Sequence, residues 1–318
     1  MKVFYFVLLL FAGLVAASAQ PQTVRAVVSA GETQGNVYAA VGQPFYQQIA
    51  GNGYEFAYSV AQAQLTRDTV RDVVTYNEPY AKHGFDLPAQ SQSHEDSVYL
   101  VNGGPYHYDL IRTLYLIVCP QSVADHVNSS IAYPSVAVSG FCWTRQNLRS
   151  PVSGAMQYVS SLNTTVPEAY GLLYAWNTAL NGTSADADGY VRGICPDGWH
   201  LPTAEEVGAL VVHPATALRS VEGWVSTAVN DNSTGFTAYP AGLYNAAVQR
   251  FEGLGTQTDW WTMAGSALDG TATGGTEGLS ATSLQFSYYC DTPLSPYRNP
   301  DDALSVRCVM KNDWPEGN

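Results

Sequence analysis

The chain has 318 residues, a formal net charge of −13 at pH 7, and only 13% charged residues. Acidic residues outnumber basic ones by 27 to 14 and no basic stripe is present, which argues against a nucleic-acid partner, because phosphates need cationic neighbours. The 28 glycines and 21 tyrosines are typical of a β-rich extracellular protein. A chain of this length can hold two or three small domains.

The first 19 residues have the pattern of a signal peptide. Lys2 supplies the positive start, residues 3–15 are apolar, and Ala17-Ser18-Ala19 forms a small-residue cleavage site before Gln20. The apolar run is shorter than the about 20 residues that cross a bilayer. We therefore expect an exported chain, in the periplasm, on the cell surface or outside the cell, with no integral membrane span after cleavage.

Two small β modules are predicted before the C-terminal half. Residues 20–66 contain alternating stretches at 36–41 and 54–61 around Gly51-Asn52-Gly53, a pattern that indicates a hairpin in an N-terminal β segment. Residues 67–120 form the second module, in which the β-branched and apolar run at 108–118 predicts a strand.

Residues 121–318 are predicted to form one further domain, with a single strong helix signal. Thr203 is a good N-cap, Glu206 completes a capping box, and Val207, Leu210 and Val211 supply apolar positions at helical spacing. A second short helix is expected within 171–180. Strands are expected at 259–262 and 284–290, and an exposed glycine-rich loop at 269–278.

Four motifs of this domain occur in the order of one known family. They are Gly140-Phe141-Cys142-Trp143-Thr144-Arg145-Gln146-Asn147-Leu148-Arg149, Tyr170-Gly171-Leu172-Leu173-Tyr174-Ala175-Trp176-Asn177, Gly193-Ile194-Cys195-Pro196-Asp197-Gly198-Trp199-His200-Leu201-Pro202-Thr203 and Ser305-Val306-Arg307-Cys308-Val309-Met310. The chain thereby resembles the Fibrobacter succinogenes major paralogous domain of exported bacterial proteins. The family is similar to C-type-lectin and formylglycine-generating-enzyme folds, so the resemblance implies an α+β, C-type-lectin-like domain behind small all-β modules. A shorter stretch, 42–46, resembles a segment common in exported Bacteroidetes proteins.

Five cysteines are present, so at least one thiol is unpaired or intermolecular, and the sequence alone leaves the pairing open. The resemblance favours a Cys195–Cys308 disulfide, because in C-type-lectin-like folds the helix-side cysteine meets the final strand. A Cys142–Cys290 bridge is the second expectation, and Cys119 is left unassigned.

No catalytic or metal-binding residues and no cofactor are predicted. His107, His126, His200 and His213 are not accompanied by a Gly-x-Ser-x-Gly elbow, and the cysteines lack zinc-site spacing. His200 is interpreted as a packed, hydrogen-bonded residue. The acidic stretches 186–189 and 299–302 offer oxygens suited to calcium, but neither carries a full ligand set.

The predicted function is binding of a glycan or a protein by an exported, non-enzymatic protein. An enzyme related to the formylglycine-generating group and a structural component of the cell envelope are the alternatives. Adjacent residues on a strand point to opposite faces, so one ring of the Trp260-Trp261 pair is expected to be less buried. The expected ligand surface comprises Trp260, Trp261, Tyr244, Asn299, Asp301 and Asp302.

Overall fold

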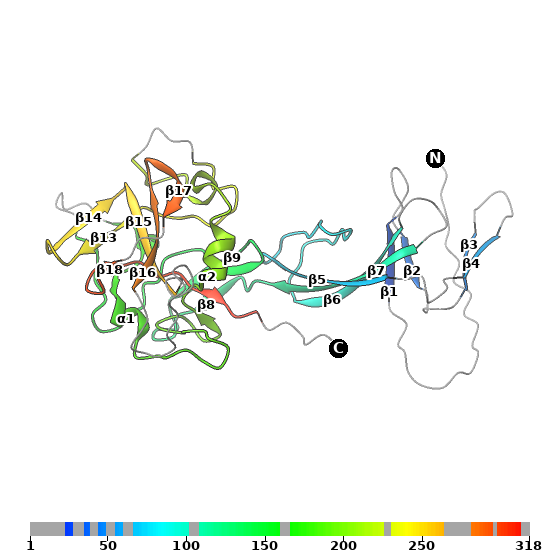
Figure 1. The fold of residues 1–318 in the computed structure, drawn as a ribbon, viewed down its shortest axis with the longest axis horizontal. Helices are drawn as coiled ribbons and strands as arrows, with labels where there is room; N and C mark the ends of the chain where they lie inside the picture. Colours follow the sequence, from blue (N-terminus) through cyan, green and yellow to red (C-terminus); the bar gives the residue numbers. More distant parts are fainter. Residues whose placement is uncertain are drawn as a thin grey trace. The chain divides into compact units, whose positions relative to one another are not determined.

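The computed structural model describes the strands at 23–27, 35–38, 44–48 and 55–59 and residues 66–101, 108–159, 166–225, 230–263, 281–294 and 298–312 (Figure 1). The predicted signal peptide and the predicted loop at 269–278 lie outside these residues. The described chain divides into two compact units. The larger consists of 73–76 and the residues from 118 onward, and the smaller holds the rest.

In the described residues of the smaller unit, the regular secondary structure consists of strands. Its sheet has the order β2-β1-β6-β7-β5, and β3 and β4 form a separate antiparallel pair. The predicted strand at 108–118 is confirmed as β7. The predicted pairing of 36–41 with the β4 segment is wrong, because β4 pairs with 44–48. The strand at 35–38 pairs with β1 instead. The strands are β1 (Thr23–Val27), β2 (Gly35–Tyr38), β3 (Pro44–Gln48), β4 (Glu55–Ser59), β5 (Thr66–Val74), β6 (His94–Val101) and β7 (Tyr108–Val118).

The larger unit contains two sheets. One has the order β12-β19-β10-β9-β8, and the other has the order β11-β18-β13-β15-β16-β17, with β14 paired to β13. The first sheet is formed by β8 (Ser122–Ala124), β9 (Ala132–Val138), β10 (Phe141–Thr144), β12 (Trp199–His200) and β19 (Val309–Met310). The second is formed by β11 (Tyr174–Ala175), β13 (Ala241–Asn245), β14 (Arg250–Leu254), β15 (Gln257–Thr262), β16 (Thr282–Ser287), β17 (Cys290–Leu294) and β18 (Ala303–Leu304).

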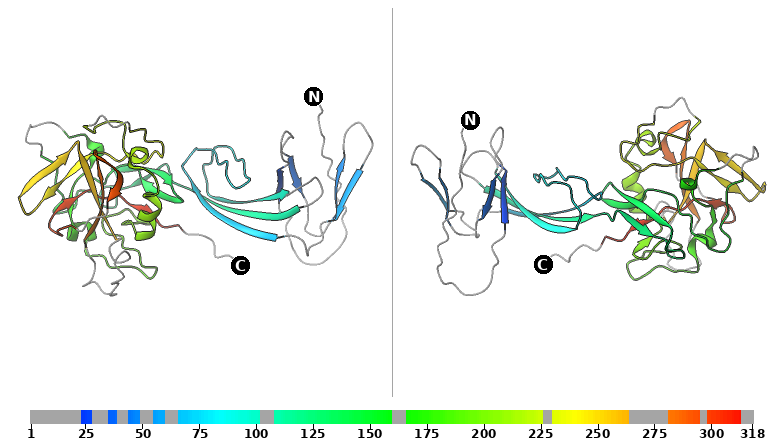
Figure 2. Two further views of the ribbon diagram at one scale, coloured as in Figure 1. Left: turned by 45° about the horizontal axis from the view of Figure 1, so that its top comes forward. Right: turned by 180° about the vertical axis from the view of Figure 1, so that it is seen from behind.

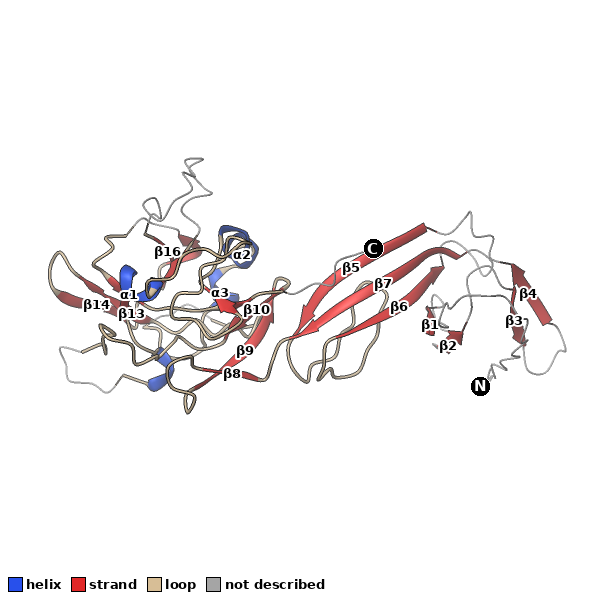
Figure 3. Cartoon of the chain, turned by 90° about the horizontal axis from the view of Figure 1, so that it is seen from below, coloured by secondary structure: helices blue, strands red, loops and turns tan. Residues whose placement is uncertain are grey.

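Helices are few and short, so the fold is largely β (Figure 3). They are the 3₁₀ turn η2 (Glu168–Tyr170), α1 (Trp176–Leu180), α2 (Ala204–Leu210) and α3 (Ala215–Leu218). The predicted capping box is confirmed at α2, where Thr203 and Glu206 bond reciprocally. The helix expected within 171–180 begins only at Trp176, because Leu173 bridges to Met156 and β11 pairs with β18. No helix in the described part of the chain is long and apolar enough to span a bilayer.

The hydrophobic core of the larger unit is formed by side chains from both sheets, α2 and α3. Figure 2 shows the ribbon that carries them from two further sides. Three edge-to-face ring contacts run through it, from Trp143 to Phe236 at 5.5 Å, on to Trp260 at 5.9 Å, and on to Phe286 at 5.2 Å between centroids. Such pairs add about 0.5–1.5 kcal/mol each beyond the area they bury. The two sheets are therefore joined by a continuous aromatic contact.

A buried cation, Arg307, stands beside this row of rings. Its Nε donates to Asn147 Oδ1 at 2.9 Å, and its two terminal nitrogens donate to the carbonyl oxygens of Thr144, Phe236 and Thr237 at 2.6–3.2 Å. The guanidinium also lies over the Phe236 and Trp260 rings. Burial lowers the pKa of Arg307 to about 9, which leaves the side chain charged at neutral pH.

Two disulfides are present. The predicted Cys195–Cys308 bond is confirmed. The expectation for Cys142 is wrong, because it bonds to Cys119 at a Cα–Cα distance of 5.5 Å. Cys142 lies on β10 of the first sheet, whereas Cys290 begins β17 at the edge of the second sheet and remains a partly exposed free thiol.

We expect Cys308→Ser to lower the free energy of unfolding by about 2–5 kcal/mol, because the Cys195–Cys308 bond closes a long loop. Cys290→Ser is the matched control and should change stability by less than about 0.5 kcal/mol, because at this partly exposed site the serine hydroxyl can replace the thiol as donor to Thr292 O. Denaturant unfolding measures both values, and peptide mapping without reduction should recover Cys119–Cys142. Recovery of a Cys142–Cys290 peptide would contradict this pairing.

Arg307→Met should cost about 3–5 kcal/mol, because it removes the guanidinium donor from three buried carbonyl oxygens and one of the two donors to Asn147 Oδ1. Arg192→Met removes an exposed pair with Asp197 and should cost no more than about 1 kcal/mol. Thermal and denaturant unfolding of both variants tests the contrast, and equal losses would show that Arg307 has no special role.

Candidate functional site

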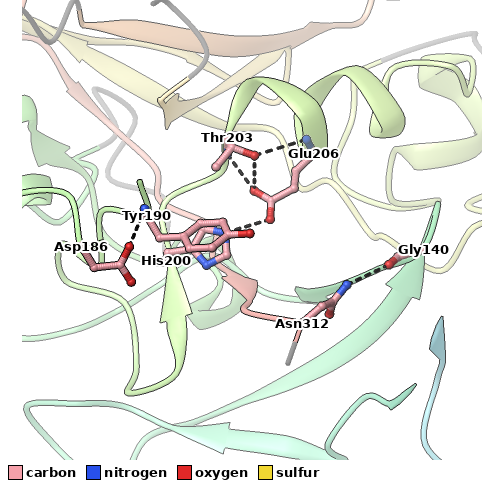
Figure 4. A network of polar contacts seen from close by, with 7 residues as sticks. All are labelled: Gly140, Asp186, Tyr190, His200, Thr203, Glu206 and Asn312. Atoms are coloured by element: carbon pink, nitrogen blue, oxygen red, sulfur yellow. Dashed lines mark hydrogen bonds and ion pairs between the residues drawn. The ribbon is translucent and has the colours of Figure 1, made fainter. Parts of the chain in front are cut away.

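The buried histidine His200 belongs to a polar network at the start of α2 (Figure 4). Its Nε2 lies 2.8 Å from Glu206 Oε1, and Glu206 Oε2 accepts bonds from the Thr203 amide at 2.7 Å and hydroxyl at 2.8 Å. The Tyr190 ring lies 4.2 Å from the imidazole, centroid to centroid. His200 and Glu206 are only 2% and 3% exposed. The prediction that His200 is packed and hydrogen-bonded is confirmed, and the pair joins β12 to α2.

The acidic loop at 186–189 is bound by Lys311. Asp186 Oδ1 accepts hydrogen bonds from the Tyr190 amide at 2.9 Å and the Asp188 amide at 3.0 Å. Lys311 forms ion pairs with the carboxylates of Asp186 and Asp188. The Tyr190 amide is the main reason that the pKa of Asp186 is lowered. Across the residues that the structure describes, no group of three or more His, Cys, Asp or Glu side chains is placed to hold a metal ion. The oxygens at 186–189 therefore serve to close this loop.

A second buried ion pair joins Asp259 on β15 to Arg298. The Arg298 Nη2 lies 2.5 Å from Asp259 Oδ1, and Gln285 of β16 donates to the same carboxylate at 3.3 Å. Burial raises the pKa of Asp259, and Arg298 opposes that shift. The carboxylate is fully buried, so its role here is to fix Arg298 against the sheet.

The expectation that one ring of the tryptophan pair is less buried is wrong. Trp260 and Trp261 are 2% and 0% exposed. Strand β15 lies between β13 and β16, and both of its faces are covered. The Trp260 indole donates to Asn147 Oδ1 at 2.8 Å, whereas Trp261 packs on Trp176 and donates to Tyr174 O at 2.6 Å.

The other predicted ligand residues lie together. Tyr244 of β13 pairs with Ala303 of β18, directly after the 299–302 loop. Asp302 is buried and accepts the Ala246 amide at 2.9 Å, which fastens the loop to β13. Asn299 and Asp301 are exposed, and Asn299 Oδ1 accepts the Asp301 amide. The structure thus brings Tyr244, Asn299, Asp301 and Asp302 to one end of the β13–β14 hairpin.

Two aromatic residues of this region were missed by the sequence analysis. They are Phe251, which adjoins Tyr244, and Tyr158, which adjoins Phe251, and both are partly exposed like Tyr244. Phe251 could have been found from the β-like run at 250–254, since it lies opposite Tyr244 across the hairpin. No local signal places Tyr158 there.

The molecule's larger unit is a largely β domain in which the Cys142–Trp143 strand, the Trp199–His200 strand and the final Val309–Met310 strand share one sheet. The family model of the Fibrobacter succinogenes major domain matches residues 136–310, and the chain belongs to this family. Comparison with curated proteins gives no match, and comparison with solved structures gives none either.

Glu206→Ala should lower the free energy of unfolding by about 2–4 kcal/mol, because it removes the capping box and leaves a buried imidazole without its partner. Glu206→Gln keeps one acceptor oxygen, which can still accept from the Thr203 amide and hydroxyl, and should cost less. Glu205, its exposed neighbour on α2, provides the control as Glu205→Ala. Denaturant unfolding gives the order of the three variants, and equal stability of Glu206→Ala and Glu205→Ala would refute the proposed role of the network.

Proposed function

We propose that this chain is an exported, non-enzymatic binding protein of a Bacteroidetes-like bacterium whose C-terminal domain binds a glycan or a protein. One observation carries the proposal. Two ionisable pairs, His200–Glu206 and Asp259–Arg298, are buried and bonded into the framework, whereas partly exposed aromatic and polar side chains gather at the β13–β14 hairpin. Binding requires such a surface and no reactive group.

Two features support export. The N-terminal sequence has the order of a signal peptide, and the larger unit contains two disulfides, which persist in oxidising compartments. The periplasm, the cell surface and the medium all fit these features. A binding or adhesion role at the cell envelope is consistent with each of them.

An esterase-type enzyme is the second candidate, because Ser139 Oγ lies 2.9 Å from His213 Nε2. Ser139 has a φ of 52° and Gly140 a φ of 82°, and these two residues connect β9 to β10. A two-residue hairpin turn with both φ values positive explains this conformation without catalysis. The bond to His213 fastens that turn to the segment between α2 and α3.

We expect the purified mature chain to retain a ligand from glycan or protein arrays and to show no turnover of ester, glycoside or thiol-oxidase substrates. Ser139→Ala should leave ligand affinity within about twofold, since the turn lies in the first sheet and the hairpin in the second. Turnover that is lost in Ser139→Ala would establish the enzyme instead. Retention in the envelope fraction with no array ligand would favour a structural component.

A further inference from the structure

Three aromatic side chains form a row across the β13–β14 hairpin. The Phe251 ring lies between Tyr158, at 5.0 Å, and Tyr244, at 5.1 Å between centroids. The planes of these pairs are inclined by 45° and 64°. We call Tyr158, Phe251 and Tyr244 the aromatic row.

The backbone fixes the position of each ring. Tyr244 and Phe251 are directly paired across the two strands, so their side chains share one face of the hairpin. The Tyr158 side chain forms a hydrogen bond with the Leu254 backbone. The Tyr158 ring packs against Gly242, where an added Cβ would lie 2.8 Å from Tyr158 Cε2. Because Gly242 also has a φ of 69°, glycine is favoured there, and the row is preorganised.

The aromatic row lies outside the hydrophobic core. Leu243, between Gly242 and Tyr244 on β13, is 1% exposed, whereas all three rings of the row are partly exposed. None of them belongs to the core cluster around Trp143, and β14 pairs only with β13, at the periphery of the larger unit (Figures 1 and 3). Three large rings at such a position are not needed to close the core.

The two charged side chains of the hairpin, Arg250 and Glu252, are paired with each other on the face opposite the row, because they flank Phe251 along β14. Arg250 Nε lies 2.5 Å from Glu252 Oε1, and Asn245 Nδ2 donates to Glu252 Oε2 at 3.2 Å. Asn299 and Asp301 add exposed side-chain oxygens at the same end of β13. The Arg250–Glu252 pairing leaves no unbalanced cation on the hairpin to attract an acidic ligand. The row therefore has the exposed oxygens of Asn299 and Asp301 at one end, and the Asp301 carboxylate disfavours an acidic ligand.

We propose that the aromatic row is a binding site for a neutral glycan, a deepening that rests on the binding function proposed above. One face of a pyranose ring carries C–H groups that pack on an aromatic ring, and its rim carries hydroxyls that bond to amides and carboxylates. Three adjoining rings about 5 Å apart offer a larger apolar contact area than a single ring could. The row contacts the apolar sugar face, and the exposed Asn299 and Asp301 side chains at the end of β13 supply partners for its hydroxyls.

The test uses the mature full-length chain and neutral oligosaccharides, namely linear hexasaccharides of glucose, mannose and xylose, beside a uronic-acid hexasaccharide. We expect at least one neutral probe to bind, and Phe251→Ala and Tyr244→Ala to weaken its affinity at least tenfold. Phe251→Leu keeps an apolar side chain without the ring and should weaken binding nearly as much. Thermal unfolding of each variant shows whether the fold is retained.

The matched control is a second exposed aromatic pair, Tyr288 and Tyr289 at the turn between β16 and β17, with centroids 5.3 Å apart. Alanine at either position should leave glycan affinity within twofold. Glycan binding that depends on these two tyrosines, and not on Phe251, would overturn the aromatic-row site but keep the binding function. Binding to the uronic-acid probe alone, to proteins alone or to no probe would overturn the neutral-glycan inference. Turnover of a probe would overturn the binding function itself.

Discussion

The larger unit depends on satisfying one buried cation. Every hydrogen-bond partner of the Arg307 guanidinium is a neutral oxygen, three from backbone carbonyls and one from Asn147. Removing a cation from water costs several kcal/mol, and only converging dipoles and ring faces can offset that cost. The fold must therefore bring three parts of the chain together around Arg307, just before β19: Thr144, Asn147 and the segment 236–237. This requirement joins the first family motif to the last and fixes the second sheet beside them.

Asn147 connects the buried Arg307 to the second sheet. Its Oδ1 accepts from both Arg307 and the Trp260 indole, while its Nδ2 donates to Tyr170 O and Ser305 Oγ. Trp260 is thereby committed to the interior, together with the strand that carries it. A ligand surface on this sheet must then use other strands, and the partly exposed rings of Tyr244 and Phe251 lie on β13 and β14 rather than on β15.

The features that the sequence predicted correctly depend on short stretches of chain or on family motifs. The capping box of α2 needs only Thr203 and the residue three positions later, and the strand at 108–118 needs only its own composition. The burial of His200 and the Cys195–Cys308 bond lie in motifs of the family. The fold was predictable at the level of a largely β domain with one well-capped helix. Of the predicted ligand residues, Tyr244 and the 299–302 loop are adjacent in the structure.

The errors share one physical cause, which is that burial and pairing depend on sheet order. Alternation along β15 correctly places Trp260 and Trp261 on opposite faces, but it cannot show that both faces are covered. Cys142 lies on β10 in the first sheet, where the pairing of β10 with β9 places it close to Cys119. Cys290 begins a strand at the edge of the other sheet. Tyr158 contacts Phe251, which is 93 positions later in the sequence (251 − 158 = 93), because Gly242 has no side chain and leaves room for the Tyr158 ring. A glycine can be read from the sequence, but the ring that packs on it can be assigned only when the strand order is known.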